Sequence, residues 1–191
     1  MKLFAKITAI ATALMLAAPA IAQQKPAAPT DGFPIGTKTA TKVGQTYVVK
    51  KTGDWDVRCV KVKDGPEPCR IYQLLKDKDG NSVAEISFFH LPGGGAAVLG
   101  ATVVTPLGTM LQNQLVFKVD GSTSRQYPFG WCETGGCIAR MGFTGLELEG
   151  LRKGKQATII ISSIVEPTKP ITLTVSLKGF SDGFSAVLVK P

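Results

Sequence analysis

The sequence predicts an all-β fold, an antiparallel β-sandwich with one or two short helices. Short runs of apolar and β-branched residues alternate with polar residues at a period of two, which is typical of half-buried strands. Turn residues separate these runs about every eight to twelve positions. Because long helices do not alternate with the runs, a parallel α/β sheet is disfavoured. A closed barrel is the alternative architecture.

Strands are expected in ten segments, which cover residues 46–51, 55–62, 70–75, 82–89, 96–104, 115–119, 125–131, 138–143, 157–164 and 171–177. Residues 77–81 and the pair Asp120-Gly121 are rich in Asp, Gly and Asn, so we expect tight turns there. Residues 91–117 are uncharged, but Pro and Gly interrupt them. They are therefore expected to form two buried strands rather than a membrane span.

Short helices are expected at two places near the C-terminus. Leu148 and Leu151 lie three positions apart within residues 144–152, so they share one face of a helix, and Gly154 is a typical stop signal. The hydroxyl of Ser181 is expected to cap a last helical turn that runs to residue 188.

The N-terminus has the three parts of a secretory signal peptide. Lys2 and Lys6 precede an uncharged, mostly apolar run, and Ala20-Ile21-Ala22 has the small-x-small pattern that signal peptidase reads. The apolar run is shorter than the roughly 20 residues that span a bilayer, which disfavours a retained anchor. We therefore expect residues 1–22 to be a signal peptide cleaved near Ala22, and the mature protein to be periplasmic or secreted.

The mature chain is expected to have two parts. Residues 23–42 are rich in Pro and Ala and predict a flexible lead-in, and residues 43–191 predict a single β-sandwich domain. The whole chain carries 22 Lys and Arg against 14 Asp and Glu, and it stays basic after the leader is removed. Because export separates the protein from nucleic acid, the expected partner is a protein or a component of the cell envelope. The oligomeric state is left open.

Cysteines occur at four positions of the mature chain, Cys59, Cys69, Cys132 and Cys137. An even number in an exported protein indicates two disulfides. Of the three possible pairings we favour Cys59 with Cys69 and Cys132 with Cys137, because each pair flanks a short, turn-rich segment. Their spacing fits neither a zinc site nor a Cys-x-x-Cys redox pair, so no metal and no cofactor is expected.

One motif suggests an enzyme. Residues 179–183 match the G-x-S-x-G pattern of a nucleophile elbow, with Ser181 in the nucleophile position. That elbow requires a parallel α/β sheet and a later histidine, whereas eight residues follow Gly183 and none is His. The one histidine, His90, lies far upstream at the end of an apolar strand. We therefore expect no catalytic residues and a protein that is not an enzyme.

Basic residues gather on the first expected strands, at Lys50, Lys51, Arg58, Lys61 and Lys63. This candidate interaction surface has two interpretations: it attracts anionic lipid or the phosphates of an outer-membrane glycolipid by peripheral contact, or it is an ordinary solvated sheet face. A second hypothesis for function is a periplasmic carrier of a small ligand or lipid. The apolar residues 91–115 and the two tryptophans, Trp55 and Trp131, suggest it.

Short motifs spread over residues 45–188 carry a family resemblance. They are Gly53-Asp54-Trp55-Asp56-Val57-Arg58-Cys59, Cys69-Arg70-Ile71-Tyr72-Gln73, Thr105-Pro106-Leu107-Gly108, Val119-Asp120-Gly121, Cys132-Glu133-Thr134-Gly135-Gly136-Cys137 and Val175-Ser176-Leu177-Lys178-Gly179-Phe180. In this order they resemble the invasion associated locus B proteins of Gram-negative bacteria.

The resemblance implies an exported cell-envelope protein with an immunoglobulin-like β-sandwich. The family is named for members that help bacteria enter host cells, although members also occur in bacteria that invade nothing. It implies that residues 179–183 are a strand-end segment, and it supplies no catalytic residues. The expected function is therefore contact with proteins or the envelope surface, with a role in host-cell invasion if the organism is a pathogen.

Overall fold

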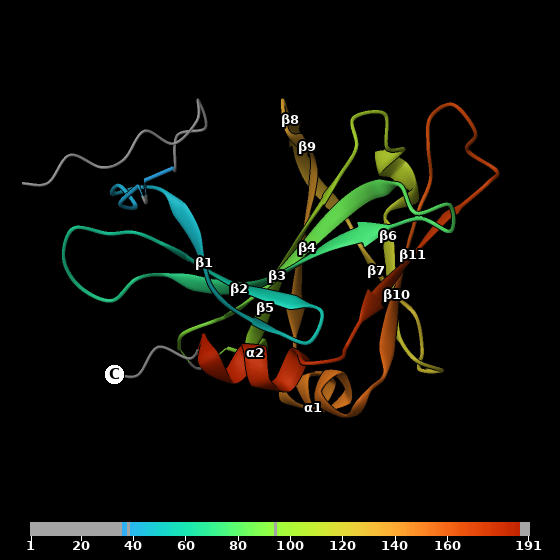
Figure 1. Cartoon of the computed structure of the whole chain (residues 1–191). Helices are drawn as coiled ribbons and strands as arrows, with labels where there is room; N and C mark the ends of the chain where they lie inside the picture. The colour runs from blue at the N-terminus through green and yellow to red at the C-terminus, as the bar shows by residue number, and fades with distance from the viewer. Residues whose placement is uncertain (1–35, 38, 94, 188–191) are drawn as a thin grey trace, which may run out of the picture. The chain divides into compact units, whose positions relative to one another are not determined.

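The computed structural model describes residues 36–37, 39–93 and 95–187 (Figure 1). The expected signal peptide, residues 1–22, lies outside the described residues, as does most of the expected lead-in. Contacts between residues group the chain from Ala40 onward into one compact unit. No described helix has the length and apolar character that a membrane-spanning helix needs.

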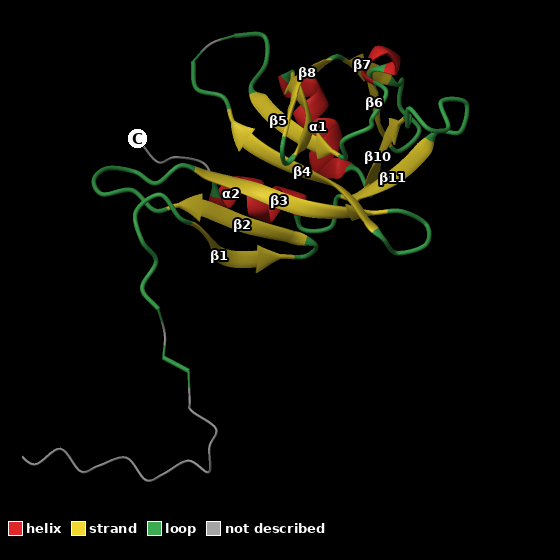
Figure 2. Ribbon diagram, turned by 90° about the horizontal axis from the view of Figure 1, so that it is seen from above, coloured by secondary structure: helices red, strands yellow, loops and turns green. Residues whose placement is uncertain are grey.

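The larger antiparallel sheet has seven strands within the described residues (Figure 2). In spatial order they are β1 (Thr46–Thr52), β2 (Trp55–Val60), β3 (Cys69–Lys76), β4 (Ser82–His90), β5 (Leu99–Thr105), β9 (Gly136–Phe143) and β8 (Phe129–Glu133). The first five follow one another along the chain, and turns and loops of two to eight residues join neighbouring strands. One of these turns is held by Asp77, whose carboxylate accepts hydrogen bonds from the backbone N–H groups of Asp79 and Asn81, both at 2.9 Å.

The smaller antiparallel sheet has four strands in the described chain. In spatial order they are β11 (Ile171–Ser176), β10 (Gln156–Ile161), β6 (Leu115–Val119) and β7 (Arg125–Tyr127). A short 3-10 turn, η1 (Leu111–Asn113), lies between β5 and β6. The inward-facing residues of both sheets join in one hydrophobic core. The prediction of an all-β, antiparallel sandwich is confirmed.

Aromatic residues dominate the part of the core near the C-terminal helix. Trp55, Phe88 and Phe180 are fully buried, and their ring centroids lie 5.2 to 5.7 Å apart in edge-to-face contacts. Full burial of such a side chain contributes about 1.5–3 kcal/mol. These three residues come from β2, β4 and the start of the last helix, so the cluster links the larger sheet to the C-terminal segment.

Two α-helices occur among the described residues and lie side by side at one end of the sandwich (Figure 1). α1 (Gly145–Lys153) begins with a capping box, in which Thr144 and Glu147 satisfy each other's backbone N–H groups. α2 (Phe180–Ala186) begins one residue before Ser181, which makes the prediction of Ser181 as its cap wrong. Phe180 is the first helical residue because its ring is buried in the core, so the N-cap is Gly179. The hydroxyl of Ser181 instead donates a hydrogen bond to the carbonyl of Arg152.

The single strand expected over residues 125–131 is also a wrong prediction. The chain leaves the smaller sheet after Tyr127 and joins the larger sheet at Phe129. Pro128 lies between the two strands, and it has no backbone N–H to donate to a strand ladder. The alternation pattern therefore continues across a change of sheet.

Candidate functional site

Both disulfides have the predicted pairing, Cys59 with Cys69 and Cys132 with Cys137. Each bond joins residues that face each other on neighbouring antiparallel strands, β2 with β3 and β8 with β9. The paired cysteines are 10 and 5 positions apart. By the loop-entropy estimate, each bond contributes roughly 2–3 kcal/mol. The disulfides therefore fix two hairpins of the larger sheet and leave the contact between the sheets to other residues.

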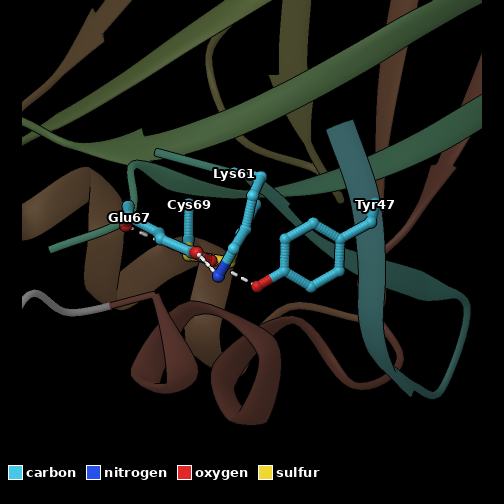
Figure 3. Close-up of a disulfide and its surroundings, with 5 residues drawn as sticks. Tyr47, Lys61, Glu67 and Cys69 are labelled. Atoms are coloured by element: carbon cyan, nitrogen blue, oxygen red, sulfur yellow. Dashed lines mark hydrogen bonds and ion pairs between the residues drawn. A yellow bond between two sulfur atoms is a disulfide. The ribbon is translucent and has the colours of Figure 1, made fainter. Parts of the chain in front are cut away.

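A cluster of polar side chains surrounds the Cys59–Cys69 bond (Figure 3). The carboxylate of Glu67 accepts hydrogen bonds from the Tyr47 hydroxyl and, at 2.7 Å, from the Lys61 ammonium. The hydrogen bonds from Lys61 and Tyr47 lower the pKa of Glu67, and the hydrogen bond to Glu67 raises the pKa of both partners. This arrangement ties β1 to the loop that closes the disulfide.

The basic residues predicted as an interaction surface are mostly engaged in ion pairs. Asp56 binds Lys51 at 3.0 Å and Arg58 at 2.9 Å. Burial alone would raise the pKa of Asp56, but the hydrogen bonds and charges of Lys51 and Arg58 lower it on balance. The Arg58 guanidinium also lies 3.3 Å from the centre of the Tyr72 ring.

Of the other predicted basic residues, Lys61 binds Glu67, whereas Lys50 and Lys63 lie exposed. Ion pairing therefore offsets much of the positive charge that the sequence places here. A role of these five residues in binding remains a prediction.

A cavity of about 810 Å³ lies between α1 and the loop that joins β6 to β7. Sequence reasoning did not find it. We call it the α1 cavity; its lining residues are Phe117, Lys118, Val119, Asp120, Gly121, Ser122, Thr123, Ser124, Arg125, Phe143, Leu146, Glu147, Gly150, Lys153 and Gly154. Two of them, Phe117 and Phe143, belong to the hydrophobic core, and their rings meet edge to face with centroids 5.3 Å apart. The α1 cavity is thus a hollow that reaches down to the core.

The helix side of the α1 cavity is formed by Leu146, Gly150 and Lys153. These residues are four and three positions apart, so they share one face of α1. The side chain of Leu146 is 85% exposed. A Cβ atom added at Gly150 would have no heavy atom within 4 Å, so the middle of this helix face borders open space.

The two acidic residues of the α1 cavity are already bound. Glu147 pairs with Arg125 and accepts hydrogen bonds from Thr144 in the capping box. Asp120 accepts hydrogen bonds from the backbone N–H groups of Lys155 and Gln156, both at 3.1 Å. Three cations also line the α1 cavity: Lys118, Arg125 and Lys153. The side chain of Lys153 is 81% exposed, and its ammonium lies 3.9 Å from the carboxylate of Glu149.

Two loops at the end of the sandwich away from the helices, between β5 and β6 and between β10 and β11 (Figure 1), carry exposed apolar side chains. We call this group the apolar loop patch; its members, with exposed fractions from 36% to 83%, are Leu107, Leu111, Ile164 and Val165. Backbone hydrogen bonds join the loops, from Met110 to Ser162 and from Ile164 to Gly108, both at 2.8 Å. The two loops are therefore fixed against each other, and these side chains lie outside the core.

The β1–β2 turn meets the C-terminal segment at a tightly packed contact. We call it the hairpin junction; it comprises Gly53, Asp54, Gln73, Ser176, Lys178 and Gly179. The buried amide of Gln73 bonds to the carbonyls of Asp54 and Ser176 and to the N–H of Ser176. The Ser176 hydroxyl donates to the Asp54 carboxylate at 2.6 Å, and the Asp54 N–H donates to the Lys178 carbonyl. Three of the motifs behind the family resemblance thus meet in space.

Comparison with known proteins tests this resemblance. The family described as "Invasion associated locus B (IalB) protein" matches residues 55–188. The chain belongs to the invasion associated locus B family. It is 24% identical over 127 residues to an "Invasion protein B homolog" of Brucella abortus biovar 1, a match that covers 66% of this chain and 71% of that protein. The predicted family membership is therefore confirmed.

A solved structure of the invasion associated locus B family has a similar fold. The crystal structure of invasion associated protein b from Bartonella henselae matches with a TM-score of 0.62 and 22% sequence identity. The match covers 73% of this chain and 93% of that chain. This likeness concerns the fold, and it agrees with the sandwich described above.

The residues that suggested other functions do not line the α1 cavity of this family member. Ser181 is on α2, and the ring of His90 packs against Phe184. The strand β4 that carries His90 pairs antiparallel with its neighbours, whereas a nucleophile elbow requires a parallel sheet. Trp55 is fully buried in the core, and Trp131 lies under the guanidinium of Arg140. The α1 cavity is formed by residues 117–125 and 143–154 instead.

Proposed function

We propose that this member of the invasion associated locus B family is an exported, non-enzymatic protein of the cell envelope that acts by binding another protein. The apolar loop patch carries this proposal. Contiguous exposed apolar side chains on a folded domain mark interaction sites, because leaving them in water is unfavourable. The backbone hydrogen bonds between the two loops reduce the entropy lost when a partner binds.

The charges beside the apolar loop patch favour a protein partner over an anionic membrane. Lys169 follows the patch but is paired with Glu166 at 3.5 Å. A surface that binds anionic lipid needs an excess of cations next to its apolar residues. The names of the relatives support a role in host-cell invasion where the organism is a pathogen.

Site-specific photocrosslinking in living cells tests the binding role. A photoreactive amino acid at Val165 should give a reproducible protein adduct, and the same amino acid at the exposed Asp64, in the β2–β3 loop, should not. The double change Ile164→Ser and Val165→Ser should abolish co-purification of the partner found in this way. Absence of a protein adduct at Val165, or equal adducts at both positions, would overturn the proposal.

Export is tested separately by fractionating the cells and sequencing the N-terminus of the protein. The proposal expects a periplasmic or secreted chain that begins near Gln23. A cytoplasmic chain that keeps residues 1–22 would contradict it.

A further inference from the structure

We infer that the α1 cavity is a binding site for an anionic amphiphile with a single acyl chain, such as a fatty acid or an anionic lysophospholipid. This inference goes beyond the proposed function, since it concerns a different end of the domain and a different class of ligand. The volume of about 810 Å³ lies within the range of roughly 300–1,000 Å³ that is typical of small-molecule sites.

The apolar part of the cavity suits an acyl chain. Phe117 and Phe143 are core residues that close its base and are almost fully buried, whereas Val119 and Leu146 offer aliphatic surface along its walls. An acyl chain that covers Leu146 would remove from water a side chain that is otherwise 85% exposed. Burial of apolar surface contributes about 25 cal/mol per Å², so this contact favours binding.

The charged part of the cavity suits an anionic headgroup. Arg125 binds Glu147 through its Nε atom, and a guanidinium has further N–H donors on its two terminal nitrogens. Lys153 lies on the same helix face as Leu146 and has only a long contact to Glu149. The carboxylates of Asp120 and Glu147 are held by protein donors, which reduces their repulsion of an incoming anion. An anionic amphiphile therefore meets cations for its headgroup and the aliphatic side chains of Val119 and Leu146 for its acyl chain.

Gly150 supports the view that this space is used. Glycine within a helix is about 1 kcal/mol less favourable than alanine. Packing explains Gly154, where a Cβ atom would come within 2.8 Å of Leu177 and Val119. No such contact exists at Gly150, where a Cβ atom would meet open space. A side chain at this position would instead project into the cavity, so glycine keeps room for a ligand.

Titration of the purified mature protein with two anionic probes, dodecanoate and a lysophosphatidylglycerol, tests the inference. Both are used below their critical micelle concentrations, with the neutral detergent dodecyl maltoside as the comparison. Native mass spectrometry and calorimetry should show one-to-one binding of at least one anionic probe and weaker binding of the detergent. The probe that binds more tightly shows whether the acyl chain comes from a free fatty acid or from a lipid.

Two pairs of variants locate the site. Gly150→Phe should weaken binding at least about tenfold by filling the cavity, whereas Gly145→Phe, on the same helix but outside the lining, should leave it unchanged. Lys153→Gln should weaken binding about three- to tenfold and reduce its salt dependence, whereas Arg152→Gln should do neither.

Thermal unfolding monitors the fold of each variant, so a loss of binding by an unfolded protein is not counted. Three results would overturn the inference: no binding of either anionic probe, equal binding by Gly150→Phe and the unaltered protein, or equal affinity for dodecyl maltoside. None of these results bears on crosslinking at Val165, which tests the proposed function independently.

Discussion

The hairpin junction and the α1 cavity both contain glycines, but the surroundings of Gly53 and Gly179 at the junction are the opposite of those of Gly121 and Gly150 at the cavity. At the junction, a Cβ atom on Gly53 would collide with the backbone of Lys178, and one on Gly179 with the backbone of Thr52. At the cavity, a Cβ atom on Gly121 or Gly150 would have no neighbour within 4 Å. The difference separates glycines that packing requires from glycines that leave room. It indicates that the junction serves stability and that the cavity is available for a ligand.

The largest effect is expected from Gly179→Ala at the junction. The change should lower the free energy of unfolding by about 2–4 kcal/mol, because the residue has φ of 82° and its Cβ atom must displace the Thr52 backbone. Urea unfolding measures the loss. Gly44→Ala is the matched control, since Gly44 has φ of 86° but open space around it. Equal losses in both variants would show that backbone conformation, rather than close packing, sets the effect.

The next effect is expected from Gln73→Ala. The change removes the amide that bonds to Asp54 and to both backbone groups of Ser176, and it leaves these groups without their partner inside the protein. We expect a loss of about 2 kcal/mol or more in the free energy of unfolding. Gln126→Ala on the exposed strand β7 should stay within about 0.5 kcal/mol of the unaltered protein. If Gln73→Ala lowers the free energy of unfolding no more than Gln126→Ala does, the hydrogen bonds of Gln73 do not stabilise the hairpin junction.

A smaller effect of opposite sign is expected at the cavity. Gly150→Ala should raise the free energy of unfolding by about 0.5–1 kcal/mol, because alanine favours the helix and its methyl group meets no neighbour. A rise in melting temperature measured by circular dichroism would support this expectation. Destabilisation would mean that packing requires Gly150 after all, and the contrast with Gly179 would be lost.

The smallest effect is expected from the charged cluster at Cys59–Cys69, which lies in neither region. Lys61 and Tyr47 lower the pKa of Glu67 below its ordinary value of 4.5. Their stabilising contribution is therefore fully present above the unfolded-state pKa and is lost as the pH falls through the lower folded-state pKa.

Melting temperatures measured from pH 7 to pH 3 check this sign. The difference between the unaltered protein and Glu67→Gln should shrink as the pH falls below about 4.5. Glu133→Gln, at an exposed position of β8, serves as the control. If the difference in melting temperature does not change with pH, the effect of Glu67→Gln comes from packing, as at the hairpin junction, and not from charge.

The sequence predicts the sandwich and the disulfides well, because both depend on local patterns. The alternation in Trp55, Val57 and Cys59 is visible within one strand, and each cysteine pair closes a single hairpin. The change of sheet at Pro128 is not visible in this way, since the alternating pattern is the same in both sheets. The start of α2 depends on a tertiary contact, the burial of Phe180 against Trp55 and Phe88.

The α1 cavity could not be predicted for a related reason. It forms where residues 117–125 approach residues 143–154. Neither segment contains a sequence motif that predicts a binding site. Gly150 lies within the helix expected over residues 144–152, and the sequence alone does not show what lies beside it. Whether a glycine permits a close contact or leaves a space depends on what lies beside it in the fold.

The hairpin junction also has a consequence for the order of folding. The hydrogen bond from Ser176 to Asp54 spans 122 positions of the chain, and the bonds of Gln73 to Ser176 span 103. Contacts between such distant residues form slowly, because a long loop must close first. Until residues 176–180 join, Trp55 and Phe88 lack their partner Phe180 and leave apolar surface uncovered. We therefore expect the N-terminal hairpins to complete their packing only after residues 176–180 have joined, and the partly folded protein to be most prone to aggregate before that step.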